Sequence, residues 1–417
     1  MKIAVAWCSL ALPLLLTCAC RSYRANPVDW KSELGSDLPQ KVAVHTVDDA
    51  VKLALVGNRK INALRLDSAM TEKVAQQAGW WEDPEFEFDL MRIVNPGDNP
   101  FLGGAGFSFS IPLSGVKKSE RRVAQLYGKV AAMRVLAAER DLSVDVRKVA
   151  IEAVFAQKKI AMLKDYHSNT SRLARAANVS RLLSAGEISI MEAGAFERLE
   201  HRIEHRMQDA KYDYRQKCLQ LCELFGLLPG VEIELKMEMN LQDALAEEKF
   251  DALKLTGLPQ VRAAMLELEV SEEILRGEIL KQYPELKIGP AYAREEGSDR
   301  FGFTAGLTLP LWNRNRKAIA EATSNRDRAR LAAIDVWREL VWQRQKAYEA
   351  LLELSRHDMP PKPDLTAPRR LVERGEIGDL EYLGFLEEEL EFNLDELEWR
   401  GKLCVARAEM SRFGVEE

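Results

Sequence analysis

The chain has 417 residues, of which 30% are charged and 7% aromatic, and its net charge is −6. This composition suits long exposed helices better than a thick globular core. The negative net charge argues against a general nucleic-acid-binding protein, because such proteins carry an excess of Lys and Arg.

The N-terminus has the pattern of a secretory signal. Lys2 precedes the apolar segment 3–16, and small residues precede Cys20. The pattern resembles a lipoprotein box, so we expect residues 1–19 to be a signal peptide and Cys20 to carry lipid. Ordinary cleavage near Ala19 is the alternative. Residues 20–45 would form a leader, and no later run reaches the roughly 18 apolar residues of a membrane helix.

A helix and a β-hairpin are predicted next. The helical pattern runs from Thr46, a predicted cap, to about Gly79. Segment 85–94 alternates Phe86, Phe88 and Leu90 with acidic residues, which is typical of a strand with one apolar face. A loop rich in Gly, Asn and Pro, 95–104, leads to a second alternating strand at 106–113.

Segment 116–226 is predicted to be a helical hairpin. Its first leg contains no Pro, and its apolar residues recur every three or four positions, as in a coiled coil. Gly186 interrupts the helical pattern, and the second leg ends near Gly226.

These elements form a first repeat, 46–230, and the same order then recurs, which indicates an internal tandem repeat. Pro84 and Pro284 are 200 residues apart, and Gly186 and Gly375 are 189 apart. The second repeat, 241–414, contains predicted strands at 284–293 and 301–309 and helices at 315–357 and 369–413, with a turn near Gly375. A Pro-rich break at 359–368 has no counterpart in the first repeat.

Four strands of this length match membrane strands, but a closed barrel needs about eight. The chain must therefore oligomerise if its strands lie in lipid as a barrel. Aromatic residues flank the strands at one end, as an interfacial girdle requires: Trp80, Trp81, Tyr283 and Trp312. A soluble four-stranded sheet packed on helices is the alternative.

The ordered set of motifs resembles the TolC-type outer-membrane efflux proteins over residues 46–414. The strand-to-helix joints FSFSIPLSGVKKSERRVA and LTLPLWNRNRKAIAEA carry the resemblance, together with the turns LLSAGEISIMEAGAFERLE and LVERGEIGDLEYLGFLEEELE. The second joint is similar to the lipoprotein subunits of heavy-metal and multidrug pumps. The family implies an α+β, mostly helical chain that trimerises into a twelve-stranded β-barrel and a helical tunnel.

The resemblance also implies site residues. Acidic residues six positions after the turn glycines narrow the periplasmic entrance in this family, and Glu192 and Glu381 occupy those positions here, with Asp379 nearby. A trimer would hold six such carboxylates in a ring, which favours cations. The turns Gly186–Glu187 and Gly375–Glu376 would dock onto a periplasmic adaptor. Ordinary solvated helix positions are the alternative for these residues.

Two further patterns have alternative interpretations. The motif HRIEH, at His201–His205, matches inverted zinc peptidases, with Glu204 as the base. Its charged surroundings favour an exposed helix face instead. Cys218, Cys222 and Cys404 fit buried small side chains, although a bridge to Cys404 is an alternative in an oxidising compartment.

We therefore expect a bacterial outer-membrane channel that extends into the periplasm, without enzymatic activity or cofactor. It would belong to a tripartite efflux or type I secretion system, with an adaptor and an inner-membrane pump as partners. The alternatives are a periplasmic coiled-coil lipoprotein with a scaffolding role and a metallopeptidase that uses HRIEH.

Overall fold

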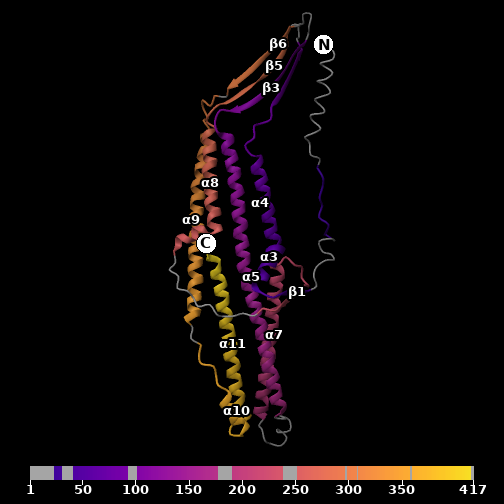
Figure 1. The fold of residues 1–417 in the computed structure, drawn as a ribbon, viewed down its shortest axis with the longest axis vertical. Coiled ribbons are helices and arrows are strands. Elements are labelled where there is room, and N and C mark those ends of the chain that lie inside the picture. Colours follow the sequence, from indigo (N-terminus) through magenta and orange to yellow (C-terminus); the bar gives the residue numbers. More distant parts are fainter. Residues whose placement is uncertain are drawn as a thin grey trace. The chain divides into compact units, whose positions relative to one another are not determined.

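The computed structural model describes residues 23–30, 41–92, 101–176, 190–237, 251–295, 298–307, 309–356 and 359–414. The chain divides into two units, Met1–Gln40 and Lys41–Glu417. The described residues of the first unit are exposed. The second unit is mostly helical with two sheets (Figure 1), which confirms the helix-rich α+β character expected from the sequence.

The two repeats have similar but unequal elements. The first contains β1 (Lys41–Val44), α3 (Val47–Gly57), α4 (Arg59–Gln77), β2 (Glu85–Arg92), β3 (Phe101–Pro112), α5 (Val116–Ala176), α7 (Ile190–Leu224) and β4 (Glu232–Leu235). The second contains the 3-10 turn η1 (Ala252–Gly257), α8 (Pro259–Leu280), β5 (Glu285–Glu295), β6 (Ser298–Leu307), α9 (Arg316–Arg356), α10 (Thr366–Glu373), α11 (Asp379–Met410) and the 3-10 turn η2 (Ser411–Phe413). Both belong to one compact unit, so they do not form separate domains.

The helical region expected at 46–79 is two helices, not one. Thr46 caps α3 as expected, because its hydroxyl accepts the Asp49 N–H at 3.0 Å. Asn58 ends α3 and caps α4, since its side-chain oxygen accepts from the backbone N–H groups of Lys60 and Ile61. Its amide group also donates to the carbonyl of Leu224 at 3.0 Å. A long-range contact with α7 therefore stabilises a break that the apolar periodicity does not reveal.

The long helix α5 has 61 residues, or about 90 Å at 1.5 Å per residue. Its buried Leu126 and Val130 pack against Val270 of α8, and further along its Val146 and Val154 contribute to the largest hydrophobic cluster. One helix of the first repeat thus supports elements of both repeats.

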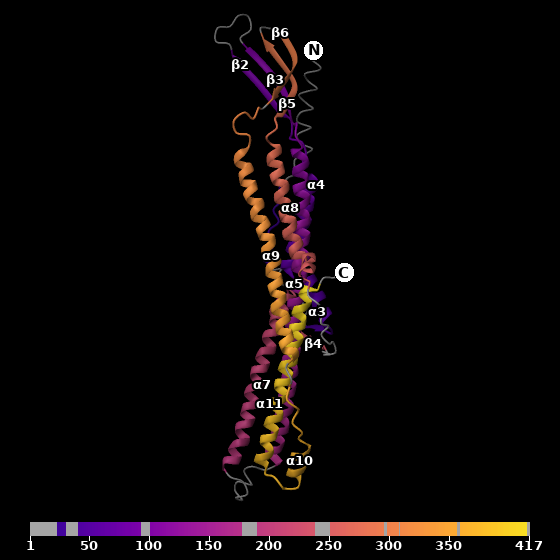
Figure 2. The ribbon, with the colours of Figure 1, turned by 90° about the vertical axis from the view of Figure 1, so that its left-hand side faces the viewer.

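The larger sheet has the strand order β2-β3-β5-β6, and every neighbouring pair is antiparallel. Each repeat contributes one hairpin, and β3 joins β5 across the repeat boundary. The strands continue into α4, α5, α8 and α9 (Figure 2). β3 begins at Phe101 rather than at 106, because Phe101–Gly104 extend the ladder with Arg92–Asp89. Residues 101–104 of the expected loop 95–104 therefore belong to β3. Residues 93–100 lie outside the described residues.

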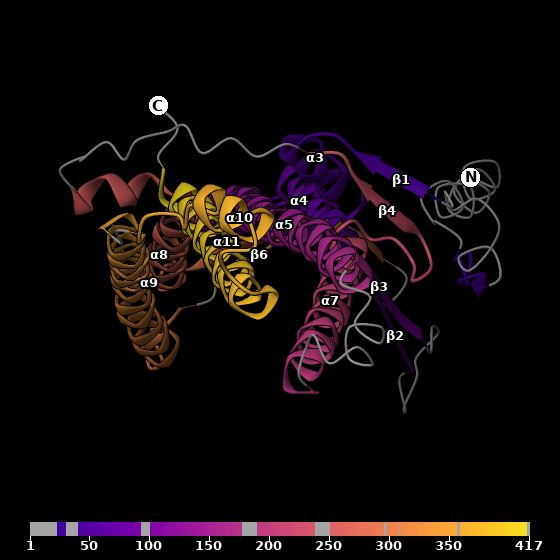
Figure 3. The ribbon, with the colours of Figure 1, turned by 90° about the horizontal axis from the view of Figure 1, so that it is seen from below.

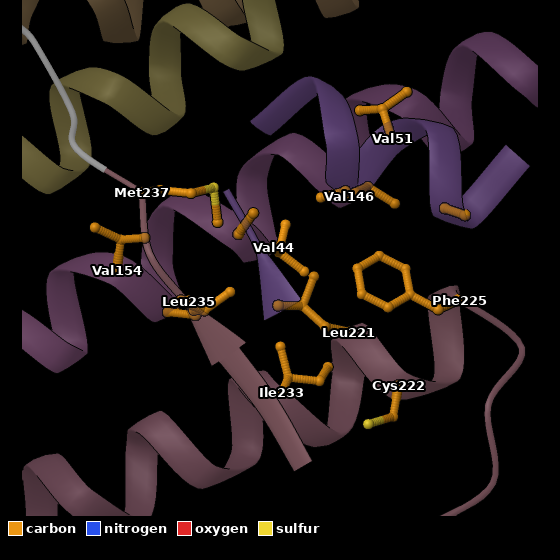
Figure 4. Packing of buried hydrophobic residues seen from close by; sticks show 14 of the residues in the cluster. Val44, Val51, Val146, Val154, Leu221, Cys222, Phe225, Ile233, Leu235 and Met237 are labelled. Carbon is orange, nitrogen blue, oxygen red and sulfur yellow. The ribbon is translucent and has the colours of Figure 1, made fainter. Parts of the chain in front are cut away.

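Two short strands were missed by sequence reasoning. β1, in the expected leader, pairs in parallel with β4, from Lys41↔Glu232 to Val44↔Leu235. Val44, Ile233 and Leu235 are buried against α5 and α7 (Figure 4). Four-residue strands have little periodicity, and these two lie far apart in the sequence, so no local pattern reveals them.

The second helical pair is interrupted. α9 ends at Arg356, the Pro-containing segment 359–365 has neither helix nor strand, and α10 follows. Gly375 then adopts φ +71, the left-handed conformation that glycine tolerates, before α11 begins. α11 packs between α9 and α5 (Figure 3). Within the described chain, none of the helices combines the length and apolar character that spanning a bilayer requires.

Candidate functional site: a two-faced sheet continued by helices

One face of the larger sheet is apolar. Strand pairing places Phe86 opposite Phe107, with ring centroids 4.9 Å apart, and Tyr292 opposite Phe301, with centroids 5.0 Å apart. Phe301 is 84% exposed, and Phe303 is 83% exposed. Large apolar surfaces of this kind mark contacts with a membrane or another protein.

The opposite face is polar and lined with small residues. Glu85, Glu87 and Asp89 alternate with the aromatic residues of β2, and the ladder places Gly106 opposite Glu87 and Gly104 opposite Asp89. Lys287 of β5 pairs with Glu85 at 3.2 Å. Glu87 and Asp89 thus stand beside glycines that leave the surface open. The period-two alternation reveals these acidic residues, but sequence analysis assigned them no role.

The two central strands approach each other closely at Gly289. A Cβ atom there would lie 1.6 Å from the carbonyl oxygen of Phe107, so no other residue fits without a shift of the backbone. β2 and β6, by contrast, are each paired on one side only. Edge strands present unpaired N–H and C=O groups that can pair with another chain.

The four aromatic residues expected to form a girdle gather at the end of the sheet nearest the helices. β2 and β5 begin at this end, and β3 and β6 finish there. The four side chains are exposed by 69%, 62%, 60% and 87%, for Trp80, Trp81, Tyr283 and Trp312 respectively.

The expected entrance residues lie at the ends of α7 and α11. Glu381 is exposed in the first turn of α11. Glu192 and Asp379 lie in the first turns of α7 and α11, but their side chains are outside the described residues. Glu376, beside Gly375, lies 3.7 Å from Arg374. Gly186, Glu187 and Cys20 are also outside the described residues, so the roles of all these positions stay predictions.

Further along α7 and α11 from these first turns, the two helices are connected by polar contacts that sequence analysis missed. Arg202 pairs with Glu387, and one turn further Arg206 pairs with Glu391. On α5, the hydroxyl of Tyr166 accepts a hydrogen bond from Asn393 of α11 at 2.7 Å. Burial raises the pKa of this tyrosine above its usual value. Matching four-residue spacings of Arg and Glu were the available sequence signal.

The two histidines of HRIEH lie on an exposed face of α7, whereas Ile203 between them is buried. His201 and His205 have side chains 82% and 80% exposed. Glu204 lies 3.5 Å from His201 and 3.7 Å from His167 of α5. The described side chains include no group of three or more His, Cys, Asp or Glu arranged to hold a metal ion.

The three described cysteines contribute to packing. Cys222 is buried in the cluster around β1 and β4, and Cys404 packs beside Ile151 and Phe155 of α5. Cys218 is half-buried next to Tyr214. Burial raises the pKa of all three thiols, so the nucleophilic thiolate is disfavoured at neutral pH.

An ion-pair network holds η2 against α5. The Arg412 guanidinium donates to Asp141 at 2.8 Å and to Asp145 at 3.1 Å. Burial raises the pKa of Asp141, and the charge of Arg412 opposes that rise. The end of the second repeat is thereby joined to the first.

Known structures provide the comparison for this architecture. No family model and no curated protein matches the chain. A membrane protein from Pseudomonas aeruginosa shares 15% identity, with a TM-score of 0.72 over 88% of this chain and 92% of that one. A CusC structure matches at 15% identity, with a TM-score of 0.71 over 95% of this chain and 99% of that one.

An outer-membrane channel, CmeC from Campylobacter jejuni, matches at 14% identity, with a TM-score of 0.66 over 95% of each chain. At such identities the comparison concerns the fold alone. It agrees with the resemblance carried by the strand-to-helix joints and the turns, and the chain has the fold of the TolC-type outer-membrane efflux channels.

Proposed function

We propose that this chain is the outer-membrane exit channel of a tripartite efflux or type I secretion system. The observation that carries the proposal is the four-stranded sheet, with an exposed apolar face, a polar face and two edges open for pairing. If β2 of one copy pairs with β6 of the next, three copies give twelve strands and close the sheet. The apolar face would then meet lipid, and the polar face would line an aqueous lumen.

Transport through such a channel is passive. A periplasmic adaptor would dock at the turns around Gly375–Glu376 and Gly186–Glu187 and connect the channel to an inner-membrane pump. Glu192, Glu381 and Asp379 would form the acidic entrance, and Cys20 would carry the lipid anchor. Opening the entrance by untwisting the helices requires the α7–α11 contacts at Arg202 and Arg206 to rearrange.

Glu87 and Asp89 extend the acidic character into the strand region of the lumen. Three copies would contribute six carboxylates at these two positions, beside the small residues Gly104 and Gly106. A ring of carboxylates concentrates cations and repels anions, so the open channel would be cation-selective.

The test is the oligomeric state and conductance of the full chain, purified from outer membranes in mild detergent and inserted into a planar bilayer. We expect a trimer with cation-selective conductance. Glu87→Gln with Asp89→Asn should reduce selectivity in the strand region, and Glu192→Gln with Glu381→Gln should reduce it at the entrance. Glu223→Gln with Glu269→Gln, at exposed helix positions, is the charge-matched control.

A trimer whose ion selectivity is unchanged in both double variants would support the channel and contradict the proposed role of the acidic residues in selectivity. A monomer without conductance would contradict the channel and favour the scaffolding role.

A further inference from the structure

The irregular segment 359–365, here called the strap, lines a hollow together with α9 and α11. The hollow has a volume of about 730 Å³. Phe392 and Trp399 of α11 contribute aromatic surface, and Pro360 and Pro361 of the strap line the opposite side. The Trp399 indole N–H donates to the Leu354 carbonyl of α9 at 2.9 Å, which fixes the orientation of the ring. Small-molecule sites commonly have this size and combine apolar surface with a few polar groups.

Acidic and aromatic residues alternate along one face of α11 at the hollow. The order is Glu388, Phe392, Asp395 and Trp399, at helical spacings of four, three and four residues. These spacings keep all four side chains on one side of the helix. Glu398 of α11 also lines the hollow, and Glu353 of α9 joins Glu388 and Asp395 as a third carboxylate that has no cationic partner among the described residues.

These three carboxylates have no cationic partner. Within the described residues, the carboxylates of Glu353, Glu388 and Asp395 form neither ion pairs nor hydrogen bonds. Glu398 and Lys402, which also line the hollow, pair with each other at 2.7 Å. Lys362 of the strap lies 3.8 Å from Glu389. The hollow therefore carries three uncompensated negative charges beside aromatic faces.

A second hollow nearby has a different charge balance. It lies among α5, α7, α9 and α11, with a volume of about 780 Å³. Its Lys148 pairs with Glu409 and its Lys217 with Glu152, both at 2.7 Å. Paired charges of both signs give this hollow no preference for a cation or an anion. The hollow beneath the strap differs from this neighbour by its three unpaired carboxylates.

We propose that the hollow beneath the strap binds monovalent organic cations with an aromatic or aliphatic body. The carboxylates attract the positive charge, the aromatic rings stabilise it through their electron-rich faces, and the prolines contact the apolar body. An anion of the same shape meets three negative charges and is rejected. The site is formed by one chain and does not depend on the proposed channel.

The experiment compares two ions of nearly identical shape and opposite charge. Tetraphenylphosphonium and tetraphenylborate are titrated separately into the full chain in neutral detergent, and bound ligand is measured by equilibrium dialysis against protein-free detergent. We expect saturable binding of the phosphonium alone. The triple variant Glu353→Gln, Glu388→Gln and Asp395→Asn should weaken it on the order of tenfold, because each lost charge removes a modest attraction.

The matched control removes three exposed, unpaired carboxylates elsewhere, through Glu223→Gln, Glu269→Gln and Asp335→Asn. Its affinity should stay within about twofold of that of the unchanged chain, because long-range charge effects are screened by salt. Phe392→Leu tests the aromatic contribution at constant charge and should also weaken binding of tetraphenylphosphonium.

Three results would overturn the proposal: equal binding of the two ions, equal weakening in both triple variants, or no saturable binding by a folded chain. A hollow filled by a second copy would give the last result, together with a change of oligomeric state in the site variant. Conductance measured on the same samples separates failure of this site from failure of the channel.

Discussion

The helical pairs of the two repeats differ, although the order of elements is the same. In the first repeat, α5 continues for 61 residues before the chain returns through α7. In the second, α9 stops after 41 residues, and the strap and the eight-residue α10 complete the distance to the turn. Proline lacks a donor N–H and disfavours helix in the residue before it, so Pro360, Pro361 and Pro363 explain the stop, while Pro368 lies in the first turn of α10.

This difference changes what α11 packs against. Near its start α11 has no long α9 beside it, and its Leu383 and Leu390 are buried against Leu163 of α5 and Leu199 and Ile203 of α7. The first helical pair thus supplies a core that the second pair lacks. A duplicated order of elements does not impose duplicated packing.

The largest expected effect is at this shared core. Leu390→Ala removes a side chain that is 2% exposed. We expect a loss of about 3 kcal/mol in unfolding free energy from lost burial and the cavity left behind. Chemical unfolding followed by circular dichroism measures it. Val56→Ala, at a position 75% exposed, is the control and should change little. Equal effects would mean that α11 does not depend on the first pair.

A smaller effect is expected at the end of the second repeat. Arg412→Gln leaves Asp141 half-buried without its cation, and we expect a loss of roughly 1–2 kcal/mol at neutral pH. The pKa of Asp141, already raised by burial, would rise further. The folded state then binds a proton more tightly than the unfolded state does, so stability falls as the pH rises through the folded pKa.

Unfolding between about pH 4 and pH 7 checks this sign, and the variant should lose more stability than the unchanged chain over that window. Arg330→Gln removes an exposed arginine of α9 and is the control. It tests whether removal of any arginine changes the pH dependence of stability in the same way. If the difference in unfolding free energy between the Arg412 variant and the unchanged chain stays constant from about pH 4 to pH 7, the role assigned to Asp141 is wrong.

Replacing the four prolines of 359–368 by alanine tests whether they alone cause the asymmetry between the pairs. We expect helix content to rise by several residues as α9 extends, with a stability change below about 1 kcal/mol because the unfolded chain also gains freedom. Circular dichroism and amide exchange of the strap measure both quantities. Unchanged helicity would show that packing on α11, rather than proline, keeps the strap from becoming helical.

The smallest effect concerns cysteines in the second helix of each pair. Cys222 of α7 is buried and Cys404 of α11 is half-buried, and burial raises the pKa of both thiols. Nearby Arg407 and Lys158 oppose the rise at Cys404 only. We expect slow alkylation of both in the folded chain at neutral pH, with Cys404 reacting several-fold faster. Peptide mapping by mass spectrometry after timed iodoacetamide treatment separates the two, and faster labelling of Cys222 would contradict the assigned burial.

The sequence by itself determined the features that depend on neighbouring residues. The alternation of Phe86 and Phe88 with acids indicated β2, Thr46 marked the start of α3, and the prolines after Arg356 marked the end of α9. These signals act within a few residues, where backbone geometry and side-chain direction are set locally. The resemblance of the joints and turns added the TolC-type fold.

Only the tertiary structure decided the features that join distant residues. The break at Asn58 depends on Leu224, the β1–β4 pairing joins segments about 190 residues apart, and α11 rests on the first helical pair. The unpaired carboxylates beneath the strap are of the same kind, since their lack of partners is a property of the folded surroundings. Such contacts form when distant segments pack together, and a local sequence pattern carries no record of which segments meet.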